Sequence, residues 1–219
     1  MNNAQHACVS SEWYTPSDII RRARYVLGSI DLDPASCTAA NQIVGASRFF
    51  AQGDNGLEQE WTGRVWLNPP SPPKAWWLKL VRSECSGVFI AYSIEALAQS
   101  RGWGESMARH IVCIPQRRIQ FWTTERHRLL KLARREAWAT ATVGAPSGPI
   151  LRDLHGEQWV ELEPGTHYRI PADVGVSGNL DRLVPGASPT HASAIVGVRV
   201  SHQRFLESFA DLGDVVVSL

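Results

Sequence analysis

The sequence has no long apolar run and no cluster of metal ligands. It contains no stretch of about 18 consecutive apolar residues, so we expect no transmembrane helix. The opening residues, MNNAQHACVS, lack the basic-then-apolar pattern of a secretory signal. Its 4 cysteines are far apart, which argues against a disulfide framework or a zinc knuckle, and its 7 histidines show neither HxxxH nor HxxE spacing. We therefore expect a cytoplasmic protein that binds no metal and no membrane.

What is present suits a soluble globular protein. The chain has 219 residues, 44% of them hydrophobic and 20% charged, which is enough for one well-buried domain with a small appendage. The formal net charge is only +1, but basic residues gather between positions 101 and 136, where only Glu105, Glu125 and Glu136 oppose them. The basic residues of this run are Arg101, Arg109, Arg117, Arg118, Arg126, Arg128, Lys131, Arg134 and Arg135. Such a run is either a surface for a phosphate backbone or a solvated helix face.

Helical and strand-like segments alternate along most of the chain. A helix is expected after Thr15, which we predict as its N-cap, and it should end at Gly28. A second short helix is expected over 36–44, a strand over 64–67, and further strands over 87–92 and 110–114 with a helical segment between them. A strand, a helix and a strand close the chain from residue 192. This order predicts an α/β fold with a mostly parallel sheet flanked by helices.

One segment departs from this pattern. Residues 144–190 are rich in glycine and proline and carry only short apolar runs. A structureless loop of that length is uncommon within a compact domain, so we interpret the segment as an inserted lobe. The main domain would then comprise 12–143 and 191–219, and the lobe is a candidate target-recognition element, because loops on rigid scaffolds carry specificity.

The stretch WLNPPSPPKAWW, residues 66–77, ends a strand abruptly. Consecutive prolines fix the backbone and remove N–H donors, and Pro69 keeps Asn68 out of the helical region. Ser71 is predicted to cap the helix that starts at Pro72 or Pro73. A stiff loop at the end of a strand is where open α/β sheets hold ligands.

Four motifs occur in order: EWYTP, DLDPAS, GDNGL and VWLNPPS. Together they resemble the phage-type DNA N-6-adenine methyltransferase (Dam) family over roughly 12–122 and the closing strand–helix–strand. The resemblance implies an S-adenosylmethionine-dependent methyltransferase with a Rossmann-like fold, acting on DNA. Such a protein would be encoded by a phage or prophage and would mask DNA from restriction in a bacterial host, or mark it.

The resemblance also implies roles for individual residues. The catalytic loop would comprise Asn68, Pro69, Pro70 and Ser71. The residues implied in binding S-adenosylmethionine are Trp13, Thr15, Pro16, Asp31, Asp33, Pro34, Ala35, Ser36 and Asp54. Of these, either Asp31 or Asp33 would lie near the charged amine or the sugar of the cofactor, and each aspartate could instead be a turn or capping residue.

The N-P-P motif departs from the family at its fourth position. Ser71 stands where the family has an aromatic residue, and serine offers no face on which a flipped base could stack. The candidates for holding the base and the DNA are Phe121, Trp122, Arg117, Arg118 and Trp76, although Phe121 could equally pack in a core and core packing is the favoured explanation of Trp76. Trp77, at helical spacing from Trp76, is more simply explained as core.

Alternatives to adenine methylation stay open. Cytosine-N4 transfer uses the same amine chemistry, whereas cytosine-C5 transfer is disfavoured because no Pro-Cys nucleophile is present. Ser71 also favours a DNA-binding protein on a methyltransferase scaffold that has lost turnover. A small-molecule or RNA methyltransferase is a further alternative.

Overall fold

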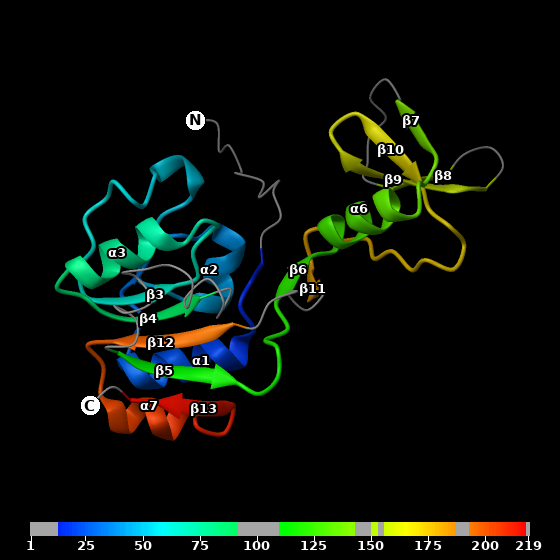
Figure 1. Ribbon diagram of the computed structural model, residues 1–219. Coiled ribbons are helices and arrows are strands. Elements are labelled where there is room, and N and C mark those ends of the chain that lie inside the picture. Colours follow the sequence, from blue (N-terminus) through cyan, green and yellow to red (C-terminus); the bar gives the residue numbers. More distant parts are fainter. Residues whose placement is uncertain (1–12, 92–109, 143–149, 153–155, 187–192, 218–219) are drawn as a thin grey trace. The chain divides into compact units, whose positions relative to one another are not determined.

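The computed structural model describes residues 13–91, 110–142, 150–152, 156–186 and 193–217 (Figure 1). These fall into two compact units. The first takes the described residues of Tyr14–Phe121 and Ala187–Leu219, and the second takes Trp13 and those of Trp122–Gly186. The helical segment expected between 92 and 110 lies outside the described residues.

A 7-stranded sheet forms the centre of the first unit, in the order β13-β5-β12-β4-β3-β1-β2. Its strands are β1 (Leu32–Asp33), β2 (Arg48–Phe49), β3 (Arg64–Leu67), β4 (Ser86–Ala91), β5 (Ile111–Pro115), β12 (Ala194–Val198) and β13 (Gly213–Val216). Strands β2, β1, β3 and β4 are parallel neighbours, and β12 is antiparallel to both β4 and β5. Strands β1 to β5 therefore run in one direction, which confirms an α/β fold with a mostly parallel sheet.

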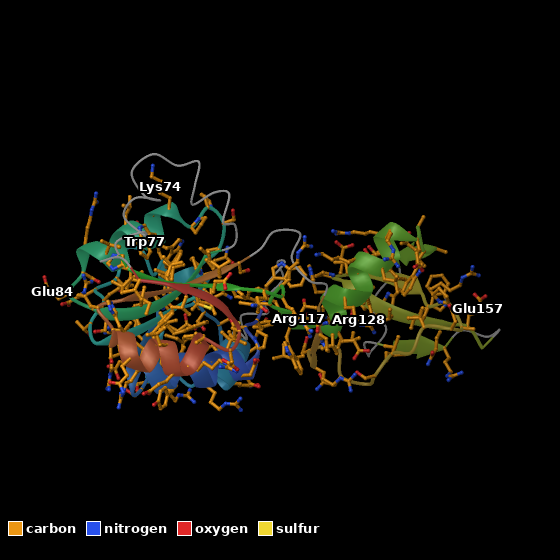
Figure 2. All side chains as sticks on the ribbon, turned by 60° about the horizontal axis from the view of Figure 1, so that its bottom comes forward. Lys74, Trp77, Glu84, Arg117, Arg128 and Glu157 are labelled. Carbon is orange, nitrogen blue, oxygen red and sulfur yellow. The ribbon has the colours of Figure 1, made fainter. Side chains whose placement is uncertain are left out.

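Helices cover both faces of this sheet. Helices α1 (Ser17–Leu27) and α7 (His202–Phe209) lie together on one face, and α3 (Lys74–Arg82) lies on the other (Figure 1). Two glycines lie close to these helices, because a Cβ at Gly87 would meet Leu80 at 2.8 Å and one at Gly197 would meet Phe205 at 2.8 Å. Trp77 of α3 is fully buried in the core beneath that helix, as expected (Figure 2).

Three helices begin at other residues than the sequence predicted. Helix α1 begins at Ser17 after Pro16, and the Thr15 side chain makes no capping bond. Helix α2 (Thr38–Val44) begins after Cys37, whose Sγ accepts a hydrogen bond from the Ala40 amide. Helix α3 begins at Lys74 after Pro73 without a side-chain cap, so the capping role predicted for Ser71 was wrong. In each case the helix starts one or more residues later than a polar residue suggested.

The second unit has its own core. Helix α6 (Glu125–Arg135) packs on β9 (Gln158–Glu163) of an antiparallel sheet ordered β7-β10-β9-β8. The other strands of this sheet are β7 (Thr140–Thr142), β8 (Ile150–Arg152) and β10 (Thr166–Arg169), and β6 (Trp122–Thr124) pairs separately with β11 (Leu183–Pro185). Leu129 and Ala133 of α6 share a core with Val160 and Tyr168. The unit therefore starts at Trp122, whereas the sequence placed the lobe at 144–190, because α6 shares its core with strands from that segment.

The described residues contain no membrane-spanning helix, because none of their helices combines the length and the apolar character needed to cross a membrane. No group of three or more His, Cys, Asp or Glu side chains among them is placed to hold a metal ion.

Candidate functional site

Two of the four motifs end adjacent parallel strands. Leu32 of β1 lies opposite Val65 of β3, and the turn of residues 33–36 and the loop of residues 68–71 follow these two strands. The chain leaves β1 for β2 on one side and leaves β3 for β4 on the other, so the strand order reverses between β1 and β3. Ligands of open α/β sheets bind outside the carboxyl ends of the strands at such a reversal. We call this side of the sheet the carboxyl edge.

The loop after β3 is poor in backbone donors. Its prolines at 69, 70, 72 and 73 carry no N–H group, so few neighbouring amides compete for its carbonyl oxygens. Asn68 is half-buried and Pro69 is buried, whereas Pro70 and Ser71 are exposed. The loop thus holds an amide side chain and rigid carbonyl groups at the carboxyl edge.

The turn after β1 contains a buried carboxyl group. Asp33 is only 3% exposed, and its Oδ1 accepts a hydrogen bond of 3.3 Å from the Ala35 amide. Burial raises the pKa of Asp33 to about 7, although the Ser36 hydroxyl and the Ala35 amide act in the opposite direction. A cationic ligand at this position would favour the ionised carboxylate.

The GDNGL segment packs against this turn through a glycine. A Cβ at Gly56 would lie 1.9 Å from the Pro34 carbonyl oxygen, so only glycine fits there. The Gly56 carbonyl also accepts a hydrogen bond of 2.8 Å from Trp61 Nε1. Asp54, by contrast, is exposed at the end of a 3-10 helix (Gln52–Asp54), and its Oδ2 accepts a bond of 2.8 Å from the Ala51 amide. Gly56 was missed by sequence reasoning, although the motif itself contained the signal.

The residues before α1 lie beside the same turn. Cys37, which follows Ser36, donates from Sγ to the Tyr14 hydroxyl at 3.8 Å. Thr15 is 5% exposed, and its buried Oγ1 has no hydrogen-bond partner among the described residues. Pro16 is half-buried and precedes the first turn of α1. A polar ligand atom bound at this turn would satisfy such a buried hydroxyl.

Asp31 lies at the amino ends of the strands, opposite the carboxyl edge. It precedes β1, and its carboxylate accepts hydrogen bonds from Arg64 Nε at 2.8 Å and Nη2 at 3.0 Å, where β3 begins. The Arg64 side chain holds the pKa of Asp31 at about 2. Its carboxylate also accepts bonds from the Arg64 amide and the Ser29 hydroxyl. Asp31 therefore joins the amino ends of two strands whose carboxyl ends carry the motifs.

The aromatic residues predicted to face a base are largely packed. Phe121 is 1% exposed, and Trp76 is half-buried and stacks on Trp61 with 6.1 Å between ring centroids. Trp122 is half-buried at the start of β6 in the second unit. Trp13 also belongs to the second unit, where its ring lies against α6.

Arg117 and Arg118 follow the carboxyl end of β5 and are exposed. Figure 2 labels Arg117. Because β5 runs in the same direction as β3, these residues lie at the carboxyl edge. Three strand spacings separate β5 from β3, which is roughly 14 Å. Within the described part of the chain, Arg117 has neither an ion pair nor a hydrogen bond.

Most of the basic run on α6 is neutralised by ion pairs. The pairs are Arg126–Asp181 at 3.7 Å, Arg128–Glu125 at 3.6 Å, Arg134–Glu163 at 2.6 Å and Arg135–Glu136 at 2.8 Å. Glu125 is a buried carboxylate among them. Burial alone would raise its pKa, but hydrogen bonds from Ser177 and the charges of Arg182 and Arg128 outweigh burial and lower the pKa. These ion pairs agree better with a solvated helix face, one of the two alternatives that the sequence left open, than with a surface for phosphate.

A groove lies along the outer side of α3, lined by Leu57, Trp61, Leu78, Lys79 and Arg82 among others. None of the residues predicted for the site lines it. Lys79 closes it on one side by donating hydrogen bonds to the carbonyls of Leu57 and Gln59. We therefore place the candidate site at the carboxyl edge and not in this groove.

Comparison with known families agrees with the motifs. The model of the family described as DNA N-6-adenine-methyltransferase (Dam) matches residues 4–138, more than half of the chain. The chain belongs to this family. Its members are enzymes that methylate adenine in DNA, which makes DNA the substrate of the family. Neither a curated protein nor a solved structure matches the chain. The matched range contains all four motifs and the whole of α6, but not the sheet of the second unit.

Proposed function

We propose that the chain transfers a methyl group from S-adenosylmethionine to the N6 amine of adenine in DNA, with the loop Asn68–Pro69–Pro70 as its catalytic element. The observation that carries the proposal is that this loop and the Asp33–Ser36 turn follow adjacent parallel strands, β3 and β1, where the strand order reverses. A methyltransferase fold of the Rossmann-like type accounts for this arrangement. The cofactor would lie against the turn after β1 and the base against the loop after β3.

The loop supplies what the amine chemistry needs. The lone pair of the adenine amine is delocalised into the ring, which makes it a poor nucleophile. The Asn68 side-chain carbonyl and the Pro69 backbone carbonyl would accept hydrogen bonds from the two amine hydrogens and draw the nitrogen towards a tetrahedral geometry. Because prolines hold these acceptors still, they act where charge develops in the transition state. No general base is required before methyl transfer, since the amine becomes acidic only afterwards.

The residues around the turn fit the cofactor. S-adenosylmethionine, when bound, supplies an electrophilic methyl group on a sulfonium. Thr15 offers a buried hydroxyl without a partner, and Asp33 offers a buried carboxyl group whose ionised form a cation would favour. Pro16, Pro34, Ala35 and Ser36 would complete the walls of the site. We favour Asp33 over Asp31 for the charged amine, because Asp31 is bound to Arg64 at the opposite edge.

DNA would approach the same edge. Arg117 and Arg118 would contact phosphate groups, and Arg117 forms no ion pair with any described residue. Phe121 is too buried to stack on a base unless its surroundings move, so its contribution rests on such a movement. The second unit would serve as the target-recognition element. An enzyme of this kind in a phage or prophage would mask DNA from restriction in the host cytoplasm.

One observation favours a second candidate, a DNA-binding protein that no longer turns over. Ser71 is exposed and gives the loop no stacking face, although extruding a base costs a few kcal/mol. Such a protein would bind both DNA and S-adenosylmethionine without producing methylated base.

The deciding experiment is direct. The purified protein is incubated with S-adenosylmethionine and unmethylated mixed-sequence DNA, and the DNA is digested to nucleosides for mass spectrometry. N6-methyladenine is the expected product. N4-methylcytosine would keep the mechanism and change the base, and no modified nucleoside with both ligands bound would favour the second candidate. Competition by RNA or small amines would test the remaining substrate classes.

A further inference from the structure

Three consecutive residues join the second unit to the candidate cofactor site. Trp13 belongs to the second unit, and Tyr14 and Thr15 belong to the first. Trp13 lies against α6, Tyr14 is beside the turn after β1, and Thr15 lies at the candidate cofactor site. Because a residue spans at most about 3.6 Å, the Thr15 backbone lies within roughly 7 Å of the Trp13 backbone.

Two side chains of α6 contact the Trp13 ring. The Lys131 Nζ lies 4.6 Å from the centroid of the Trp13 ring, and the His127 ring meets the Trp13 ring edge-on with 6.4 Å between centroids. Lys131 and His127 are one helical turn apart on α6. Burial lowers the pKa of His127, and the charges of Lys131 and Arg134 lower it further, so a neutral His127 packs against the indole. A cation over an indole face is the most favourable of the cation–π pairs.

The other end of the segment is fixed at the candidate site. Tyr14 is buried, and its hydroxyl accepts a hydrogen bond from Cys37, the residue after Ser36. Thr15 follows, with a buried Oγ1 that no other described residue contacts by a hydrogen bond, and Pro16 restricts the backbone where α1 begins. Trp13 is therefore linked to Thr15 through only two peptide units.

From these contacts we infer that Trp13 is a positioning residue that couples cofactor binding at the carboxyl edge to DNA binding by the second unit. The inference rests on the proposed function. It also departs from the role that the family resemblance implies, in which Trp13 lines the cofactor pocket. Trp13 acts instead through Thr15, by setting where that hydroxyl lies when α6 responds to DNA. Coupling of this kind is reciprocal, so the cofactor must change DNA affinity by the same factor.

The test compares several variants of the full chain by one quantity, the ratio of the S-adenosylmethionine dissociation constants measured without and with DNA. Dissociation constants of S-adenosylmethionine are determined by calorimetry with and without mixed-sequence duplex DNA. In the unmodified protein we expect DNA to change the dissociation constant by about fivefold or more, which is the lower end of ordinary coupling. Trp13→Ala should bring the ratio close to one while each ligand still binds alone. Trp13→Phe, which keeps an aromatic face, should retain part of it.

Two further variants separate the contact from general effects. Lys131→Met keeps the apolar stem of the side chain but removes the cation over the indole, and it should reduce the ratio. Arg21→Met removes an exposed charge from α1 and should leave the ratio unchanged. This pair keeps the inference testable even if Trp13→Ala folds poorly.

The possible failures are distinct. Absence of cofactor binding by the unmodified protein would overturn the proposed function and the inference with it. If both ligands bind but DNA leaves the cofactor dissociation constant unchanged, the coupling alone is wrong. If Trp13→Ala weakens cofactor binding equally with and without DNA, Trp13 is a pocket-lining residue and the inference is also wrong.

Discussion

Arg64 and Asp31 form a two-point ion pair, with Nε 2.8 Å from Oδ2 and Nη2 3.0 Å from Oδ1. The Arg64 amide also donates to Oδ2 at 2.9 Å, so one carboxylate fixes both the side chain and the backbone at the start of β3. A Cβ at Gly63 would lie 2.6 Å from Oδ2, which shows how closely the chain wraps this carboxylate. The pair aligns β1 with β3, and their other ends carry the candidate site.

Asp31→Asn should therefore reduce stability and leave cofactor affinity unchanged. The pair is partly exposed and screened, so we expect a fall in melting temperature of about 1–4 °C at neutral pH. The pKa of Asp31 is lowered to about 2, so the stabilisation is present above pH about 4 and is lost as the pH falls towards 2. Thermal melts from pH 2 to 7, with calorimetry of S-adenosylmethionine, test this. A large loss of cofactor affinity in the folded variant would return Asp31 to the cofactor site.

Gly56→Ala should damage the site, whereas Gly53→Ala in the same motif should not. A Cβ at position 56 would overlap the Pro34 carbonyl oxygen at 1.9 Å, whereas one at position 53 meets nothing within 4 Å. We expect Gly56→Ala to weaken cofactor binding about tenfold or more and to lower the melting temperature. Gly53→Ala should be neutral or slightly stabilising, by up to about 1 kcal/mol. Equal behaviour of the two variants would contradict the packing of this segment on the turn.

Apolar patterning predicted the elements better than polar residues predicted their ends. Residues 64–67 form β3 as expected, and Ile19, Ile20, Ala23, Val26 and Leu27 are all buried on α1. The capping predictions failed because a serine or threonine near a proline has other uses. Thr15 is buried beside the candidate site, and Ser71 is exposed in a loop that continues through two more prolines before α3 begins.

Contacts distant in sequence were beyond prediction. The basic run was visible, but the partners of Arg126 and Arg134 are Asp181 and Glu163, which only folding brings near. The start of the second unit at Trp122 depends in the same way on α6 packing against β9. The sequence did place the NPP loop at the end of a strand, where open α/β sheets hold ligands, but only the strand order shows that the turn after β1 lies at the same edge.

Cofactor affinity should depend on pH through Asp33. Its pKa is raised to about 7, so below this pH the carboxyl group is largely neutral and attracts a cation weakly. Binding should therefore strengthen as the pH rises through about 7 and then level off, and Asp33→Asn should bind more weakly with a flatter profile. Calorimetry between pH 5 and 8 measures this, and the variant retains any titration that belongs to the cofactor itself. An unchanged slope in Asp33→Asn would exclude the role.

The raised pKa of Asp33 also affects the ligand-free protein, whose stability should fall as the pH rises, whereas cofactor affinity should increase. Between the ordinary pKa of 3.8 and about 7, the folded state binds a proton that the unfolded state has released. The free energy of unfolding should therefore decrease as the pH rises across this window, by at most about 1.4 kcal/mol per pH unit. Asp33→Asn should remove this contribution.

Ser71→Tyr should accelerate methylation of duplex DNA more than that of single-stranded DNA. Position 71 is exposed, so an aromatic ring can be added without displacing core, and it would restore a face for an extruded base. Only the duplex must be unstacked, so the single-turnover rates on matched duplex and single strands form the test. A slower rate on both substrates would show that another side chain already occupies the space of the base.

Asn68→Ala should lower single-turnover methylation by orders of magnitude while cofactor affinity and melting temperature change little. The substitution removes one acceptor for the amine hydrogens and leaves the proline-fixed backbone in place. Asn68→Asp is the informative companion, because it keeps an acceptor oxygen at nearly the same position and adds a negative charge. We expect it to retain more activity than Asn68→Ala. Full activity in Asn68→Ala would end the catalytic assignment of the loop, and equal loss in both variants with cofactor binding abolished would make Asn68 a residue of the cofactor site.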